Sequence, residues 1–324
     1  MPLRRGPRRA TGSLRPVALA AAGCVLVSCS SAGPDRSDGP ETPVASPTAT
    51  VRPDGREPAP TTGPTTDPTT RPVLPAVPAR QAPALAGQLD RAAATLRDPG
   101  ARAADVRRAG ELQQLAARAL AEAPPRFRVR VTDRLRPATA RATRNDVRAA
   151  MLLHGMSAPA PRLPRWRIVA PPPPAELLRL YRRAERSTGV PWEYLAAIHL
   201  VETRMGRIDG VSSAGARGPM QFLPSTWQLY GAGGDIEDPR DAIPAAARLL
   251  ARHGAPRDMA GALWHYNPSD RYVGAVTAYA RNLQRSPSAY AGYWHWRVLY
   301  QHVRGVRVLP VGYPKRPAQP LAGR

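Results

Sequence analysis

The aromatic side chains of this 324-residue chain are concentrated towards its C-terminus. Seventeen of the eighteen Phe, Trp and Tyr residues follow residue 165, and only Phe127 precedes that point. Aromatic side chains bury large apolar areas and therefore dominate hydrophobic cores. Many of the 39 prolines, by contrast, fall between residues 40 and 85. The main hydrophobic core is therefore predicted in the C-terminal half.

The first thirty residues have the order of features that is typical of an export signal. Five arginines precede an apolar run over residues 16–27. This run is shorter than the ~20 residues of a transmembrane helix but suits a signal peptide. It ends in Leu26-Val27-Ser28-Cys29, which resembles the lipobox of bacterial lipoproteins, where the cysteine is lipidated. Cys24 is a weaker second candidate, and an ordinary secretory signal with two incidental cysteines is the alternative.

These features predict a location for the protein. We expect residues 1–28 to be a lipoprotein signal peptide and Cys29 to carry a lipid. The protein would then be exported and anchored to the outer face of the cytoplasmic membrane, facing the cell wall. Without Cys24, and with Cys29 lipidated, the mature chain would have no free thiol and no disulfide.

The net charge of +23 is carried almost wholly by arginine, because Lys315 is the only lysine. A compositional bias of the genome is one explanation, and attraction to a polyanion is the other. Nucleic acid is not favoured, because no zinc-finger spacing and no Gly-rich phosphate loop accompany the charge. An exported protein would instead meet an anionic wall and membrane surface.

Composition divides the rest of the chain into four parts. Residues 29–82 are rich in Pro and Thr and cannot bury enough surface to offset the entropy of ordering, which predicts a disordered tether. Residues 83–156 change to Ala, Leu, Arg and Glu at helical spacing, which predicts a small helical appendage packed on the main domain. Residues 165–300 are the expected main domain, and residues 301–324 a C-terminal tail.

The main domain is predicted to be helical. Helices are expected over residues 175–187, 191–205, 224–230, 239–253, 256–265 and 269–284, several with proline in the first turn. No alternating strand pattern of convincing length is present. The predicted fold class is therefore all-α.

Glu202 lies at the edge of an apolar helix face. Tyr194, Ile198, Val201 and Met205 follow one another at helical spacing. Because an α-helix turns about 100° per residue, Glu202 sits about 40° from Ile198. Glutamate is rarely buried without a partner, so either an arginine pairs with it or it has a catalytic role. In the catalytic interpretation, partial burial raises the pKa of the carboxyl, as a general acid near neutral pH requires.

The segment after this helix suits a carbohydrate cleft. Residues 212–222 form a loop of small residues in which backbone N–H groups could approach a sugar closely. Ser212 could also hydrogen-bond the Glu202 carboxyl. Four aromatic residues could stack on pyranose faces, although each taken alone is more often a core residue: Trp227, Tyr230, Trp264 and Tyr266.

Three motifs in this order resemble the lytic murein transglycosylases, closest to the soluble-lytic and membrane-bound B-type branches. They are Glu202-Thr203-Arg204, the Ser-x-x-Gly-Ala-x-Gly-x-Met-Gln stretch over residues 212–221, and Tyr266-Asn267-Pro268-Ser269 with Tyr272. The resemblance covers about residues 165–285 and implies a lysozyme-like, α-rich catalytic domain in an actinobacterial lipoprotein form.

The resemblance also assigns roles to residues. It makes Glu202 the catalytic residue and Ser212 its hydrogen-bonding neighbour. It places Met220 and Gln221 along the sugar cleft, and Tyr266, Asn267 and Tyr272 near the reacting sugar.

The chain departs from the family pattern in two places, at residues 231–238 and at Met220. B-type members often carry a calcium-loop-like insertion, but residues 231–238 are too short for the twelve-residue calcium pattern. The six histidines also lack metal-ligand spacing. We therefore expect no metal and no cofactor. Met220 stands where soluble members often have leucine, which should matter little.

The implied reaction needs one carboxylate. The resemblance implies that Glu202 protonates the bond between N-acetylmuramic acid and N-acetylglucosamine and then deprotonates the muramyl 6-hydroxyl, which closes a 1,6-anhydro ring. Hydrolysis of the same bond by a peptidoglycan hydrolase, or a catalytically silent wall-binding protein, are the alternatives. The expected partners are peptidoglycan glycan strands and the membrane, reached through the lipid anchor, with the protein as a monomer.

Overall fold

A computed structural model describes residues 77–321 of the chain. The predicted signal peptide, both cysteines and residues 29–76 of the predicted tether lie outside the described residues. Between residues 77 and 321, no helix combines the length and apolar composition that crossing a membrane requires.

Four helices lie within residues 82–154, the part of the chain where the sequence predicts an appendage. They are α1 (Ala82–Arg97), α2 (Ala103–Glu122), α3 (Pro125–Thr132) and α4 (Pro137–His154). Proline occupies the first turn of α1, α3 and α4, where its missing N–H removes no helical hydrogen bond. Leu85, Leu89, Leu120 and Val131 belong to a small core that holds no fully buried aromatic ring.

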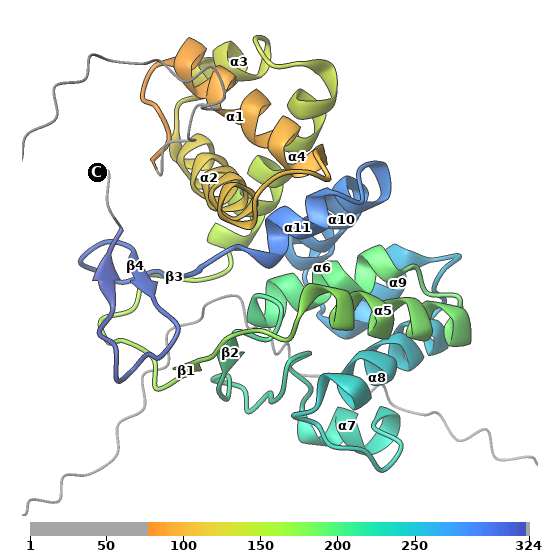
Figure 1. Ribbon diagram of the computed structural model, residues 1–324. Coiled ribbons are helices and arrows are strands. Elements are labelled where there is room, and N and C mark those ends of the chain that lie inside the picture. The colour runs from red at the N-terminus through yellow and green to blue at the C-terminus, as the bar shows by residue number, and fades with distance from the viewer. Residues whose placement is uncertain (1–76, 322–324) are drawn as a thin grey trace, which may run out of the picture. The chain divides into compact units, whose positions relative to one another are not determined.

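Seven helices form the main domain (Figure 1). They are α5 (Pro174–Thr188), α6 (Trp192–Thr203), α7 (Pro224–Tyr230), α8 (Pro239–Arg252), α9 (Met259–Tyr266), α10 (Asp270–Arg285) and α11 (Ala289–Trp294). The described residues are mostly helical, which confirms the predicted all-α fold class. The six predicted helices are all present, with ends that differ by three residues at most.

Helix α6 lies at the centre of the main domain. Ten of its twelve residues are buried, so it is a core helix surrounded by neighbours, whereas the sequence predicted one apolar stripe. Helices α5 and α10 both pack against it. Polar residues on α6 therefore sit inside the core, and His199 and Glu202 are the clearest examples.

The appendage packs closely on the main domain, as expected. Helix α4 lies along α10, and α2 lies against α11. At the α2–α11 contact Gly110 meets Gly292, where an added Cβ on Gly110 would collide with the Gly292 carbonyl. These interactions show why a helical segment with so few aromatic residues is ordered: it shares its buried surface with the main domain.

Short strands complete the fold. β1 (Arg167–Ile168) pairs antiparallel with β2 (Ile208–Asp209), with Ile168 opposite Ile208. β3 (Val298–Tyr300), β4 (Arg307–Leu309) and β5 (Gln319–Pro320) form an antiparallel sheet. Residues 307–309 and 319–320, within the expected tail, thus form one sheet together with β3. Trp166 packs edge-on against Tyr300 at 5.8 Å in a small core that Leu309 and Tyr313 also join.

Candidate active site

The end of α6 fixes the position of Glu202. Arg204, Met205 and Gly206 all have positive φ angles, of 55°, 61° and 82°, which reverse the chain directly after the helix. The Thr203 hydroxyl donates to the carbonyl of Pro219 at 2.6 Å. The chain reversal and this hydrogen bond hold the last turn of α6 against the loop that follows.

The Glu202 carboxyl is buried and has one hydrogen-bond donor. Glu202 is only 2% exposed. The Tyr272 hydroxyl, from α10, donates to Glu202 Oε1 at 2.6 Å. The other oxygen, Oε2, is buried and has no partner among residues 77–321. One oxygen is therefore held by the protein, and the other is left for a reacting group.

Burial raises the pKa of Glu202 to about 8, because the charged form loses its hydration. The hydrogen bond from Tyr272 and the charge of Arg204 oppose this shift. At neutral pH the carboxyl is therefore mostly protonated. Burial also raises the pKa of Tyr272 well above its ordinary value, so its hydroxyl stays neutral and can donate.

An ion pair does not explain the burial of Glu202. Arg204 donates to the Leu200 carbonyl at 2.5 Å, and Arg207 donates to the Trp294 carbonyl at 2.5 Å. Neither guanidinium forms a salt bridge with Glu202 within the described part of the chain. Pairing with an arginine, the alternative to a catalytic role for Glu202, is therefore not observed among the described residues.

The loop after β2 is shaped by its own hydrogen bonds. Ser212 Oγ accepts from the backbone N–H groups of Ala214 and Ala216, at 3.2 and 2.9 Å. The expected hydrogen bond from Ser212 to the Glu202 carboxyl is not formed; Tyr272 takes that place. Gly218 has φ +73°, and a Cβ there would collide with the Ile236 carbonyl, so this position of the loop requires glycine.

Met220 and Gln221 lie where the loop meets α9. Met220 is fully buried, and its carbonyl accepts the Tyr266 hydroxyl at 2.6 Å. Gln221 has a positive φ of 50°, and its Nε2 donates to the carbonyls of Gly210 and Gly218. Gln221 Oε1 is buried without a partner in the described structure.

The junction of α9 and α10 supplies the remaining polar groups. The rings of Tyr266 and Tyr272 are nearly parallel, with centroids 6.3 Å apart. The pKa of Tyr266 is raised by burial and by the nearby Glu202. Asn267 is 1% exposed, and neither polar atom of its side chain has a partner among the described residues.

Unpaired buried polar atoms are thus concentrated around Glu202. Four of the ten such side-chain atoms in the described residues belong to Glu202, Gln221 and Asn267. Buried polar atoms are paired almost everywhere in folded proteins, so a cluster of unpaired ones indicates a place where a polar ligand binds. The bonds from Tyr266 to Met220 and from Tyr272 to Glu202 connect these residues into one site.

The other acidic residues near the site have structural roles. Asp238 caps α8 by accepting from the Arg240 N–H, Asp235 accepts from the Glu237 N–H, and Glu237 pairs with Arg217. Asp209 is exposed and faces Arg167 at 3.5 Å. Glu202 is therefore the only one of these acids that is buried in the site. Nor do three His, Cys, Asp or Glu side chains of residues 77–321 gather as a metal site would require.

The aromatic residues proposed to stack on sugars have different environments. Trp227 packs edge-on against Phe222 at 5.4 Å, and the Tyr230 hydroxyl contacts His253 at 3.2 Å. Trp264 is 48% exposed on α9. Of the three, Trp264 alone presents a largely open ring.

One comparison with known proteins gave a match to this part of the chain. Residues 179–287, about a third of the chain, match the family model of the transglycosylase SLT domain. The match includes the end of α6, the loop to Gln221 and the α9–α10 junction. It supports a lytic transglycosylase acting on peptidoglycan. Neither the curated proteins nor the solved structures gave a match to this chain.

Proposed function

We propose that this protein is an exported peptidoglycan lytic transglycosylase. It cleaves the β-1,4 bond between N-acetylmuramic acid and N-acetylglucosamine, leaves a 1,6-anhydro-muramyl end, and serves cell-wall remodelling. The observation that carries the proposal is the Glu202 carboxyl: it is buried, protonated near neutral pH, and has one oxygen with no partner within the described structure.

In the first step Glu202 acts as a general acid. Its proton moves to the glycosidic oxygen, the bond from that oxygen to muramyl C1 breaks, and positive charge develops at C1 and the ring oxygen. The carboxylate that forms would be costly in a dry site. The hydrogen bond from Tyr272 to Oε1 favours this charged form, so it stabilises the carboxylate as the proton leaves.

In the second step the same carboxylate acts as a base. It takes the proton of the muramyl 6-hydroxyl while O6 bonds to C1, which closes the anhydro ring and returns Glu202 to its protonated form. The proton given in the first step is recovered in the second, so no water is consumed. A single carboxyl is sufficient, in keeping with the structural roles of the neighbouring acids.

The remaining site residues position the sugar in this proposal. Gln221 Oε1 and both polar atoms of Asn267 are available for the N-acetyl and hydroxyl groups of the substrate. Met220 and Tyr266 hold the loop against α9 through their hydrogen bond. Ser212 acts by shaping the loop through its two backbone contacts.

Mass analysis of products from purified peptidoglycan tests this function. Anhydro-muramyl ends are expected. Reducing muramyl ends instead would identify a hydrolase, and an absence of products together with retained binding would identify a wall-binding protein. Either of these two results would overturn the proposed reaction.

The proposed location is the outer face of the cytoplasmic membrane, with a lipid on Cys29. Expression of the full chain in a bacterium that processes lipoproteins should place it in the membrane fraction. The Cys29→Ala variant should move to the soluble or secreted fraction, whereas Cys24→Ala should not. Release by Cys24→Ala alone would assign the lipid to Cys24 instead.

A further inference from the structure

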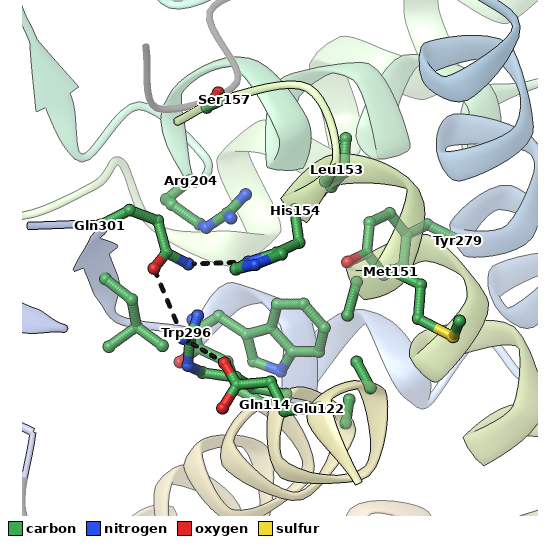
Figure 2. Close-up of a pocket in the computed structure, with 15 residues that line it drawn as sticks. Gln114, Glu122, Met151, Leu153, His154, Ser157, Arg204, Tyr279, Trp296 and Gln301 are labelled. Atoms are coloured by element: carbon green, nitrogen blue, oxygen red, sulfur yellow. Dashed lines mark hydrogen bonds and ion pairs between the residues drawn. The ribbon is translucent and has the colours of Figure 1, made fainter. Parts of the chain in front are cut away.

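A cavity lies where the appendage meets the main domain. It has a volume of about 440 Å³, within the size range of small-ligand sites. Its walls come from α2, the end of α4, Arg204 after α6, Tyr279 on α10, and residues 296–301. Figure 2 shows Arg204, Tyr279 and Trp296 on different sides of this space. Glu202 does not line it.

The walls of the cavity are mainly apolar and small. Ala117, Ala121 and Ala150 contribute methyl groups, and Leu153 and Trp296 contribute larger surfaces. Glu122 is the one acidic residue in the lining, and it pairs with Arg118 on the next turn of α2. Arg204 is the other arginine of the lining, and no acidic residue of the lining forms a salt bridge with it.

Arg204 is the charged group that makes the cavity unusual. Burial lowers the pKa of Arg204, which reports the cost of keeping the charge away from water. Its NH1 donates to the Leu200 carbonyl, and among residues 77–321 the rest of the guanidinium makes no hydrogen bond or ion pair. A desolvated guanidinium is normally paired with an anion, and no residue between 77 and 321 forms an ion pair with Arg204.

The Tyr279 hydroxyl adds a second polar group to the same space. Tyr279 is only 2% exposed, yet its hydroxyl has no hydrogen-bond partner in the described residues. The charge of Arg204 lowers the pKa of Tyr279, and burial opposes this effect more strongly. Arg204 and the Tyr279 hydroxyl therefore both border the same cavity.

We infer that this cavity is a second binding site, which takes a carboxylate-bearing peptide built of small residues. Arg204 and the Tyr279 hydroxyl bind the carboxylate, and the alanine methyl groups and Trp296 pack against the peptide's small side chains. A guanidinium binds a carboxylate through two parallel hydrogen bonds, which suits the unused N–H groups of Arg204.

The position of the cavity indicates the source of the peptide, a step that rests on the proposed function. Tyr272 contacts Glu202, and Tyr279 follows seven residues later on the same face of α10, about 10 Å away along the helix. Extended peptide spans about 3.3–3.6 Å per residue, so three residues cover this length. In length, the stem peptide of a muramyl residue bound near Glu202 therefore matches the separation between Glu202 and the cavity.

Binding of a synthetic peptide to the full-length protein tests the inference without any cleavage. The probe is an alanine-containing stem tetrapeptide with a free C-terminal carboxylate, titrated by calorimetry. Its C-terminal amide and the peptide-free sugar chitotetraose are titrated in parallel. We expect saturable binding of the acid, and binding of the amide that is at least about fivefold weaker, in keeping with the loss of a charge-assisted hydrogen bond.

Two variants and a matched control identify the cavity. Tyr279→Phe removes only a hydroxyl and should weaken binding about fivefold; Arg204→Gln should weaken it about tenfold or more. Arg207→Gln is the control, because Arg207 is also a largely buried arginine bonded to a backbone carbonyl but lies outside the cavity. It should bind the peptide as the unaltered protein does.

Four results would overturn the inference: no saturable binding, equal affinity for acid and amide, unchanged affinity in Tyr279→Phe, or competition by chitotetraose. If Arg204→Gln does not fold, Tyr279→Phe decides the outcome alone. Peptide binding by a protein that produces no anhydro-muramyl ends would support the cavity and refute the proposed reaction, so the two can fail separately.

Discussion

Residues 77–321 contain two buried carboxyls, and they differ in what surrounds them. Glu202 lies among α6, α9 and α10, and Asp146 lies among α4, α10 and α11. Both have a tyrosine hydroxyl as a donor, Tyr272 at 2.6 Å and Tyr293 at 2.5 Å. Burial raises both pKa values, to about 8 for Glu202 and about 7 for Asp146.

The amide that contacts Asp146 is paired at both its nitrogen and its oxygen, whereas amides near Glu202 keep unpaired atoms. Asn282 Nδ2 donates to Asp146 at 2.9 Å, and Asn282 Oδ1 accepts from Asn145 at 2.8 Å. Near Glu202, in contrast, Gln221 and Asn267 keep unpaired buried atoms. A raised pKa therefore shows that a carboxyl is buried. By itself it does not distinguish a functional site from a structural network. The unpaired polar atoms distinguish a site that awaits a ligand from a network that joins two parts of the fold.

The Glu202→Gln substitution should produce the largest effect. Glutamine keeps the shape of the side chain and can accept from Tyr272, but it cannot donate and recover the proton. We expect the rate of anhydro-muramyl formation to fall about 10³-fold or more, with circular dichroism unchanged. Asp146→Asn is the matched control and should retain activity per folded molecule. Substantial cleavage by Glu202→Gln would refute its role.

The Asp146→Ala substitution should produce the largest loss of stability. It leaves the Tyr293 hydroxyl without its acceptor and removes one of the acceptors of Asn282 Nδ2 at the contact between appendage and main domain. We expect the free energy of unfolding to fall by about 2–4 kcal/mol, measured by urea denaturation. A loss as small as that of an exposed surface substitution would show that the network does not hold the two parts together.

The pH dependence of stability separates the two carboxyls further. Each has a folded-state pKa above its ordinary value, so its stabilising effect is complete below the ordinary pKa and is lost as pH rises to the folded one. The windows are pH 4.5 to about 8 for Glu202 and pH 3.8 to about 7 for Asp146. His199 acts in the opposite direction, because burial lowers its pKa to about 3.

The measurable quantity is thus the difference between variant and unaltered protein. The thermal midpoint of Glu202→Gln should improve relative to the unaltered protein as pH rises from 4.5 to about 8. That of Asp146→Asn should improve only up to about pH 7. Differences that do not depend on pH would show that these carboxyls are not protonated in the folded state.

The two tyrosines should give the smallest effects and the sharpest contrast. Tyr272→Phe and Tyr293→Phe each remove one hydroxyl, and each should cost about 1 kcal/mol of stability. Because the Tyr272 hydrogen bond lowers the pKa of Glu202, Tyr272→Phe should also move the loss of activity at high pH to a higher pH. Tyr293→Phe should leave that limb of the pH–rate profile in place. A shift in both variants would contradict the separation of the two networks.

The sequence predicted the helices more completely than the contacts between them. Proline in the first turn and apolar spacing place α5 to α10 within three residues of their observed ends. The strands β3 to β5 were missed because each has only two or three residues, too few to show an alternating pattern. These strands pack on a small core that includes Trp166, Tyr300 and Tyr313, which are distant in sequence.

The sequence also selected Glu202, but not its partner. A carboxylate at the edge of an apolar helix face is visible in the spacing of residues 194–205. The donor to this carboxyl was expected to be Ser212, which is nearer in sequence. It is Tyr272, because α10 packs along α6 and brings a residue 70 positions away into contact. The burial of Asp146 could not be predicted in the same way, because its helix has the composition of a solvent-exposed basic segment.

What the sequence determined by itself is the local chemistry: where helices begin, which loop must be flexible enough to bend sharply, and which acid sits on an apolar face. Only the tertiary structure decided which polar atoms find partners. Pairing depends on distances of about 3 Å between residues far apart in the chain, and helical periodicity contains no information about them. The unpaired atoms of Glu202, Gln221 and Asn267 in the described structure, and the absence of an ion pair at Arg204 among the same residues, become visible only when the helices have packed.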